Sequence, residues 1–266
     1  MIRRDIITPD RRPAWLLIPQ IAHAELAGNL AEVWRLDALG SAEVAADLRM
    51  AIHRHDDGWS DWDTRPGIDP KLGRPVNFDE MRLADSLAIW TRSIDEAVAR
   101  GPLVGYCVAG HFTRLLRRFD SWRRDRALEA LAREFLGRQE GNMAHWLVDW
   151  QGAKGASIDG MGADVARRGV SYLQFFDAIS LWFCCADRME PWKADLTDGE
   201  SWTFSPSAGL AQGCQEVRIS PWPLTVDRFN LTAGGRAVLA AEYRSTDEML
   251  ASTVAPELTL SWHLRP

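Results

Sequence analysis

The chain has 266 residues, of which 46% are hydrophobic, so it can bury a sizeable core and is not a disordered protein. Its formal net charge of −6 argues against binding a nucleic-acid polymer through a basic face. No apolar run approaches the roughly 18 residues of a transmembrane helix, so no membrane partner is expected.

The cysteines and the N-terminus indicate a cellular compartment. None of the four cysteines belongs to a CxxC motif, which favours buried, reduced thiols. The first residues carry charges but no apolar segment followed by a small-residue cleavage site. We therefore expect a cytoplasmic protein.

The predicted elements change character along the chain. A short strand is expected at Trp15–Ile18, where Pro19 ends it. From about 20 to 190 the apolar spacing is mostly helical. Helices are expected at 20–36, 42–56, 82–100, 102–119, 123–150 and 163–190. From about 200 to 266, short runs rich in Val, Leu and Thr alternate with turn residues and predict strands.

These elements predict a mainly α fold. We expect a helical bundle with a small C-terminal antiparallel sheet, which the N-terminal strand can join. No internal repeat or low-complexity linker separates the parts. The prediction is therefore one domain, 1–266, with a helical body at 20–190 and a β-rich appendage at 200–266.

Three histidines, His23, His55 and His111, lie on apolar stripes of three different predicted helices. Apolar residues recur around each one at helical spacing, so these imidazoles should face inward. His53 lies about 200° around the helix from His55 and should point outward.

Asp177 lies on a similar stripe, and Asp56 flanks the inward face of His55. A buried carboxylate must be neutralised, paired or bound to a metal. In one interpretation the histidines are hydrogen-bonded core residues and Asp177 pairs with Arg168 or Arg92. In the other, these side chains converge on a metal, because imidazole and carboxylate together suit Zn, Fe, Mn, Ni or Co.

The order of these residues resembles a known superfamily. His23, then His55-Asp56, then Asp177 is similar to the ligand order of the HD superfamily of metal-dependent phosphohydrolases. The resemblance implies that these four side chains hold one metal. It also implies that Asp56 bridges to a second metal where two are present.

Many two-metal members of that superfamily insert further histidines before the last aspartate. His111 and His145 stand in that interval. His145 could also belong to a solvated helix stripe that includes Asp149. The sequence departs from the usual pattern after the HD pair, where it has Asp57–Trp59 in place of a hydrophobic residue and glycine.

A closer resemblance covers most of the chain. The stretches that carry it are QIAHAELAGNLAEVW, HDDGWSDWD, GRPVNFDEM, GHFTRLL and QFFDAISLWFCC. They are similar to an uncharacterised bacterial family, the one called domain of unknown function 3891. This resemblance implies membership of the family but supplies no activity.

Together the patterns predict a metal-dependent phosphohydrolase that acts on a nucleotide or small phosphoester. Its cofactor would be one or two divalent ions of Mn, Fe, Ni, Zn or Mg. Asp56 and Asp57 are expected to take part in catalysis, Asp57 as a base near the ligands or as a helix cap. The side chains expected to contact substrate are Trp59, Trp62, Arg82 and Arg114, with Arg92 and Lys71 as further candidates.

Two other functions stay open. Proteins resembling myo-inositol oxygenase carry a di-iron centre whose ligand order also fits, with His145 included. A noncatalytic binding protein with a vestigial polar centre is the other alternative. A homodimer is possible, because soluble proteins often form one.

Overall fold

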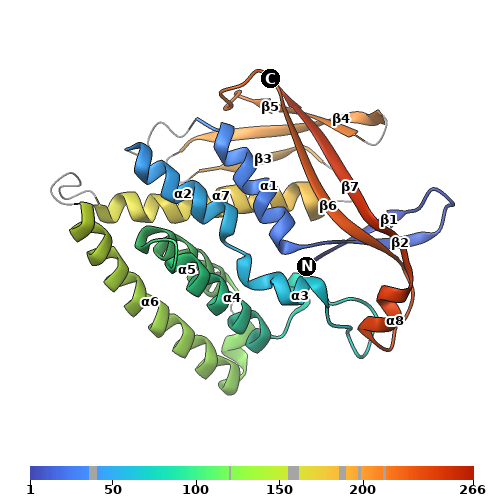
Figure 1. The fold of residues 1–266 in the computed structure, drawn as a ribbon, viewed down its shortest axis with the longest axis horizontal. Coiled ribbons are helices and arrows are strands. Elements are labelled where there is room, and N and C mark those ends of the chain that lie inside the picture. The colour runs from blue at the N-terminus through green and yellow to red at the C-terminus, as the bar shows by residue number, and fades with distance from the viewer. Residues whose placement is uncertain (36–40, 120, 155–161, 186–189, 197–198, 212–213) are drawn as a thin grey trace. The chain divides into compact units, whose positions relative to one another are not determined.

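The computed structural model describes most of the chain, and the described chain divides into two compact units (Figure 1). The residues outside the description are 36–40, 120, 155–161, 186–189, 197–198 and 212–213. The sheet unit comprises Met1–Arg35, Trp59–Met81 and Asp177–Pro266, and the helical unit comprises Leu36–Gly58 and Arg82–Phe176. The single-domain organisation stays a prediction.

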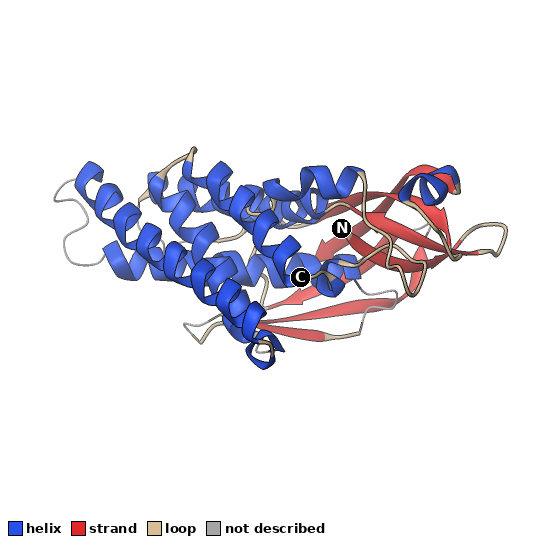
Figure 2. Cartoon of the chain, turned by 90° about the horizontal axis from the view of Figure 1, so that it is seen from below, coloured by secondary structure: helices blue, strands red, loops and turns tan. Residues whose placement is uncertain are grey.

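The helical unit is built from long amphipathic helices, drawn in blue in Figure 2. They are α2 (Ala42–Arg54), α4 (Leu83–Val98), α5 (Pro102–Arg118), α6 (Arg126–Lys154) and α7 (Gly162–Cys185), of which α7 continues into the sheet unit. Ser41 begins α2, and its Oγ accepts a hydrogen bond from the Val44 amide at 3.3 Å. Pro102 begins α5 at a position where a missing N–H is harmless. In this unit α5 packs against α2, α4 and α6.

The helix positions agree with the predicted ones to within a few residues. The predicted helix residues 36 and 186–189 lie outside the described part of the chain. Helix α1 (Gln20–Val33) belongs to the sheet unit, where it packs against one of the strands.

The described strands of the sheet unit form one seven-stranded sheet in the order β1-β2-β6-β7-β5-β4-β3. They are β1 (Ile2–Ile7), β2 (Pro13–Ile18), β3 (Trp192–Asp195), β4 (Ser201–Ala211), β5 (Cys214–Ser220), β6 (Phe229–Leu239) and β7 (Thr253–Arg265). Strands β5 and β7 are parallel, and the other neighbouring strands are antiparallel. The buried positions alternate at the end of β7, where Trp262 and Leu264 face the core.

The predicted fold class, a mainly α HD-like bundle with a small antiparallel sheet, is wrong. The sheet is a large, mixed half-barrel that draws strands from both ends of the chain. The prediction missed β1 because its IRRDII sequence is charged in the middle, and it missed the parallel pair because pairing cannot be read from one strand. The pairing of the N-terminal strand with the C-terminal strands is confirmed, with Leu16 opposite Ala237.

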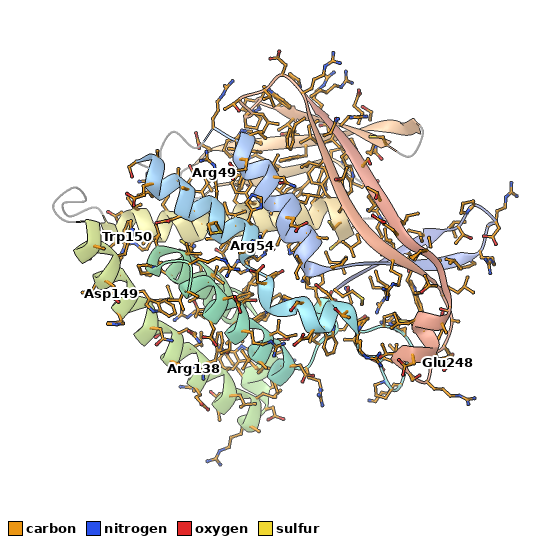
Figure 3. All side chains as sticks on the ribbon, viewed as in Figure 1. Arg49, Arg54, Arg138, Asp149, Trp150 and Glu248 are labelled. Atoms are coloured by element: carbon orange, nitrogen blue, oxygen red, sulfur yellow. The ribbon has the colours of Figure 1, made fainter. Side chains whose placement is uncertain are left out.

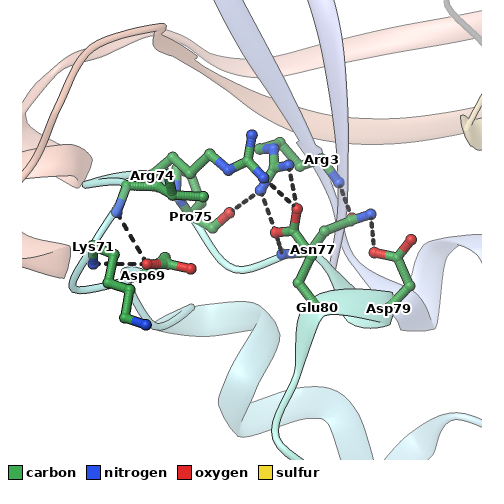
Figure 4. Close-up of polar contacts among 9 residues, drawn as sticks. Arg3, Asp69, Lys71, Arg74, Pro75, Asn77, Asp79 and Glu80 are labelled. Carbon is green, nitrogen blue, oxygen red and sulfur yellow. Dashed lines mark hydrogen bonds and ion pairs between the residues drawn. The ribbon is translucent and has the colours of Figure 1, made fainter. Parts of the chain in front are cut away.

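Short helices and a loop complete the sheet unit: α3 (Ser60–Thr64), α8 (Thr246–Ala251) and the 3₁₀ turn Phe78–Glu80. A further 3₁₀ turn, Asp57–Trp59, begins in the helical unit and ends in the sheet unit. The loop before Phe78 is fastened to β1 through Arg3 (Figure 4). The Arg3 guanidinium donates to both carboxylate oxygens of Glu80, at 2.8 and 2.9 Å, and to the Pro75 carbonyl. Arg74 donates to the same carboxylate at 2.6 Å.

Two further observations concern the lengths of the helices and the cysteines. Among the described residues, no helix combines the length and the apolar character needed to cross a membrane. All four cysteines are described and are free thiols. Cys107 and Cys184 are buried as predicted, but the prediction is wrong for Cys185, which is exposed, and for Cys214, which is partly exposed.

Candidate metal centre

His55 and Asp56 lie side by side where α2 ends, and both side chains are buried. His55 Nδ1 donates a hydrogen bond to the Ile52 carbonyl at 2.9 Å. A carbonyl oxygen can only accept, so Nδ1 carries a proton, and in the neutral imidazole Nε2 then has a lone pair. That Nε2 lies 3.5 Å from Asp56 Oδ2.

The turn after this pair is held tightly against α4. The Gly58 amide donates to Ser93 Oγ at 3.0 Å, and Arg92 Nε donates to the Gly58 carbonyl at 3.3 Å. A Cβ at position 58 would lie 2.5 Å from the Ser93 nitrogen and closer still to the Ile89 carbonyl oxygen. Only glycine allows this approach. The position of the turn Asp57–Trp59, which follows the His55-Asp56 pair and is named the HD turn, therefore depends on Gly58 and Ser93.

Helix α5 brings a second buried histidine to the same part of the helical unit. The His111 side chain is 2% exposed. Its ring centroid lies 5.3 Å from that of His55, with the two rings edge to face at 73°. Phe112 flanks it at 5.0 Å. The inward phase predicted for His55 and His111 is therefore confirmed.

In the sheet unit, His23 on α1 meets Asp177 and Ser180 on α7. Ser180 Oγ donates to the Asp177 backbone carbonyl at 2.9 Å, which commits the single hydroxyl proton. The 2.7 Å contact between His23 Nδ1 and Ser180 Oγ is therefore donated by the imidazole. In the neutral imidazole the lone pair is then on His23 Nε2, which lies 3.7 Å from Asp177 Oδ1.

Each unit thus holds an imidazole nitrogen opposite a carboxylate oxygen, at 3.7 and 3.5 Å. Both distances exceed the roughly 2.7–3.2 Å of an N–H···O hydrogen bond. Two donors about 2.1 Å from one tetrahedral ion would lie about 3.4 Å apart. The buried His and Asp side chains of the described residues therefore form groups that could hold a metal ion. Protonated imidazoles in ion pairs are the ordinary alternative.

Asp57, a predicted catalytic residue, is engaged in ion pairs. Its Oδ2 accepts from Arg100 at 2.8 Å, and its Oδ1 lies 3.8 Å from the Arg54 guanidinium, which Figure 3 labels. Burial raises the pKa of Asp57, and the charges of Arg100 and Arg54 oppose that rise. These contacts give Asp57 a structural role in the turn, and its catalytic role stays a prediction.

The two tryptophans predicted to contact substrate both pack against other parts of the protein. The Trp59 side chain is 2% exposed. Trp62 packs against the buried cluster of the sheet unit that includes Met1, Leu17 and Val238. Trp62 keeps part of its surface exposed, and the substrate contacts of both tryptophans stay a prediction.

The remaining predicted site residues make other contacts, and none of them belongs to the buried His and Asp groups. Arg82 is exposed and pairs with Asp85 at 2.8 Å. The His145 side chain is 73% exposed, and its Nε2 lies 3.3 Å from Asp149 on α6 (Figure 3). Arg114 lines a cavity of the helical unit. The sequence analysis did not predict roles for Ser180 and Ser93. Ser180 could have been found, because it follows Asp177 by three residues and so lies on the same face of the helix.

Fold and site define an α+β protein with buried His and Asp groups suited to a metal ion. The chain belongs to the DUF3891 family, described as a protein of unknown function, whose family model matches residues 6–239. The predicted membership is confirmed. No curated protein and no solved structure gives a significant match. The likeness to the HD superfamily stays a resemblance in ligand order.

Proposed function

We propose that the protein is a metal-dependent phosphohydrolase that acts on a small phosphoester. The proposed ligands are His23, His55, Asp56, His111 and Asp177. The observation that carries the metal site is the repeated arrangement of an Nε2 lone pair opposite a carboxylate oxygen, with the Nδ1 proton held by Ser180 or by the Ile52 carbonyl. Metal-ligating histidines commonly donate their other ring N–H in this way.

The donor set restricts the ion. Three imidazoles with two carboxylates favour Zn, Fe, Mn or Ni, whereas Mg prefers oxygen ligands. When bound, such an ion lowers the pKa of a water molecule and polarises a phosphoryl oxygen. The chain supplies the burial that keeps bulk water from the donors, since His23, His55 and His111 are each at most 2% exposed.

A phosphoester also needs a cationic partner, and Arg92 is the candidate that the structure favours. Its Nε donates to the Gly58 carbonyl, two residues after Asp56, so its guanidinium lies at the HD turn. Arg82 is bound to Asp85 at the surface. We therefore assign the phosphate contact to Arg92 and propose no stacking role for Trp59 or Trp62.

The reaction class rests on the order of the ligands along the chain, His, His-Asp, Asp, which resembles that of metal-dependent phosphohydrolases. The di-iron oxygenase alternative uses His145 as a sixth ligand. Because His145 is exposed and pairs with Asp149, the hydrolase has the stronger support.

The test is elemental analysis of protein purified without a histidine tag or chelator. His23→Ala and His55→Ala should each lose most of the metal that the wild-type protein carries. His53→Ala and His145→Ala are matched controls and should keep it, since neither is a proposed ligand. The metal-loaded protein should then hydrolyse p-nitrophenyl phosphate or a nucleotide, and Arg92→Gln should raise KM.

The outcomes separate the alternatives. Absence of metal from the wild-type protein, even after reconstitution, would reject both enzyme functions and favour the noncatalytic one. Bound iron with dioxygen consumption and no phosphatase activity would favour the oxygenase.

A further inference from the structure

A cavity of about 290 Å³ lies among α5, α6 and α7 of the helical unit, and none of the proposed ligands lines it. Arg114 lines it from α5, and Met143, Leu147 and Val170 supply apolar walls. His111 follows Gly110, a lining residue, in the chain but does not itself line the cavity. The cavity is therefore a separate feature of the fold.

The charge of Arg114 has no acidic partner among the described residues. Its guanidinium donates to Ser171 Oγ at 3.0 Å, to Gln174 Oε1 at 3.1 Å and to the Arg167 carbonyl at 3.4 Å, and all three acceptors are neutral. Arginine has five N–H donors, so two remain for another acceptor. Burial lowers the pKa of Arg114, as expected for a cation held without a counter-ion.

The other charges at this cavity are already compensated. Arg117 forms an ion pair with Glu140, and both line the cavity. Arg167 forms one with Asp164. The cavity therefore offers one uncompensated positive charge beside a carboxylate, which suits a monoanion better than a phosphate dianion. Tyr106, also in the lining, carries a hydroxyl that can donate a hydrogen bond.

We propose that this cavity binds a small amphipathic monoanion, with a carboxylate on Arg114 and a hydrocarbon part against Met143, Leu147 and Val170. A carboxylate matches the planar donor geometry of a guanidinium, and the apolar walls favour the burial of a short hydrocarbon chain. The volume is at the small end for ligand pockets, which limits the ligand to a short or medium chain. This inference does not depend on the proposed hydrolase activity.

The test is calorimetric titration of the full-length protein with sodium octanoate. Saturable one-to-one binding is expected, with octan-1-ol and sodium phosphate binding at least tenfold more weakly. Arg114→Met should weaken octanoate binding at least tenfold, while Arg117→Met, which removes a cation already paired with Glu140, should change it less than threefold. Ala144→Phe should also weaken it, because position 144 is exposed at the rim and the larger ring occludes the cavity.

Three results would overturn the proposal. One is the absence of saturable octanoate binding to the wild-type protein. Another is octanol or phosphate binding as tightly as octanoate. The third is octanoate binding that neither Arg114→Met nor Ala144→Phe weakens, with circular dichroism showing that at least one of these variants is folded.

Discussion

Replacing Gly58 with alanine tests how the HD turn is positioned. The new methyl group would lie 2.5 Å from the Ser93 amide nitrogen and 2.8 Å from Ser93 Oγ, and closer still to the Ile89 carbonyl oxygen. Two of these three atoms belong to the backbone of α4. The steric clash can therefore be removed only if the turn moves away from the helix. Overpacking of this kind costs typically about 1–3 kcal/mol. The gain of about 0.4–1 kcal/mol from a stiffer unfolded chain offsets only part of it.

The matched control is Gly137→Ala on α6, where the added methyl group meets nothing within 4 Å beyond the neighbouring turns of its own helix. In a helix interior this change should stabilise by about 0.5–1 kcal/mol. Urea denaturation of both variants should therefore give free-energy changes of opposite sign. Metal content should fall with Gly58→Ala and stay constant with Gly137→Ala. A Gly58→Ala protein as stable as the wild type would refute the reasoning, because it would show that the turn does not need this close approach.

Three further predictions concern stability and metal binding. Ser180→Ala leaves the buried His23 Nδ1–H without its acceptor, so unfolding should become easier by about 1–3 kcal/mol and metal affinity should fall about tenfold or more, measured by denaturation and by competition with a chelating dye. Removing metal with EDTA should lower the melting temperature by on the order of 5–10 °C for an ion previously at a hundred times its Kd, and an unchanged melting temperature after verified removal would contradict metal binding to the native state. Hydrogen bonds from Arg3 hold the pKa of Glu80 at about 2, below its ordinary 4.5, so its stabilising effect is present above pH 4.5 and is lost as pH falls toward 2. Glu80→Gln should therefore destabilise by about 1 kcal/mol at pH 7, and the effect should fade as pH falls through about 2, measured by urea denaturation across pH.

Periodicity predicted the helices and their inward faces well. The helix predicted at 102–119 is observed at Pro102–Arg118, and the one predicted at 82–100 is observed at Leu83–Val98. The burial predicted for His23, His55 and His111 is confirmed. These features depend on local spacing within one helix, which a single sequence contains.

The sheet could not be predicted to the same extent, because strand pairing joins residues far apart in the chain. Leu16 pairs with Ala237, and Val217 pairs with Leu264 where β5 and β7 run parallel. Strand β4 contains Pro206, and its register shifts between Pro206 and Leu210, so the alternation expected of a strand is interrupted. Such strands are specified by their neighbours more than by their own sequence.

The imidazole protons are the part of the site that local sequence could have revealed. Ser180 follows Asp177 by three residues, so the two share a helix face, and a histidine that meets this face contacts both the hydroxyl and the carboxylate. His55 uses a carbonyl three residues earlier, that of Ile52. The two histidines should therefore differ in their sensitivity to mutation. A side-chain change at Ser180 can release the His23 proton, whereas no side-chain change at Ile52 removes the carbonyl that holds the His55 proton.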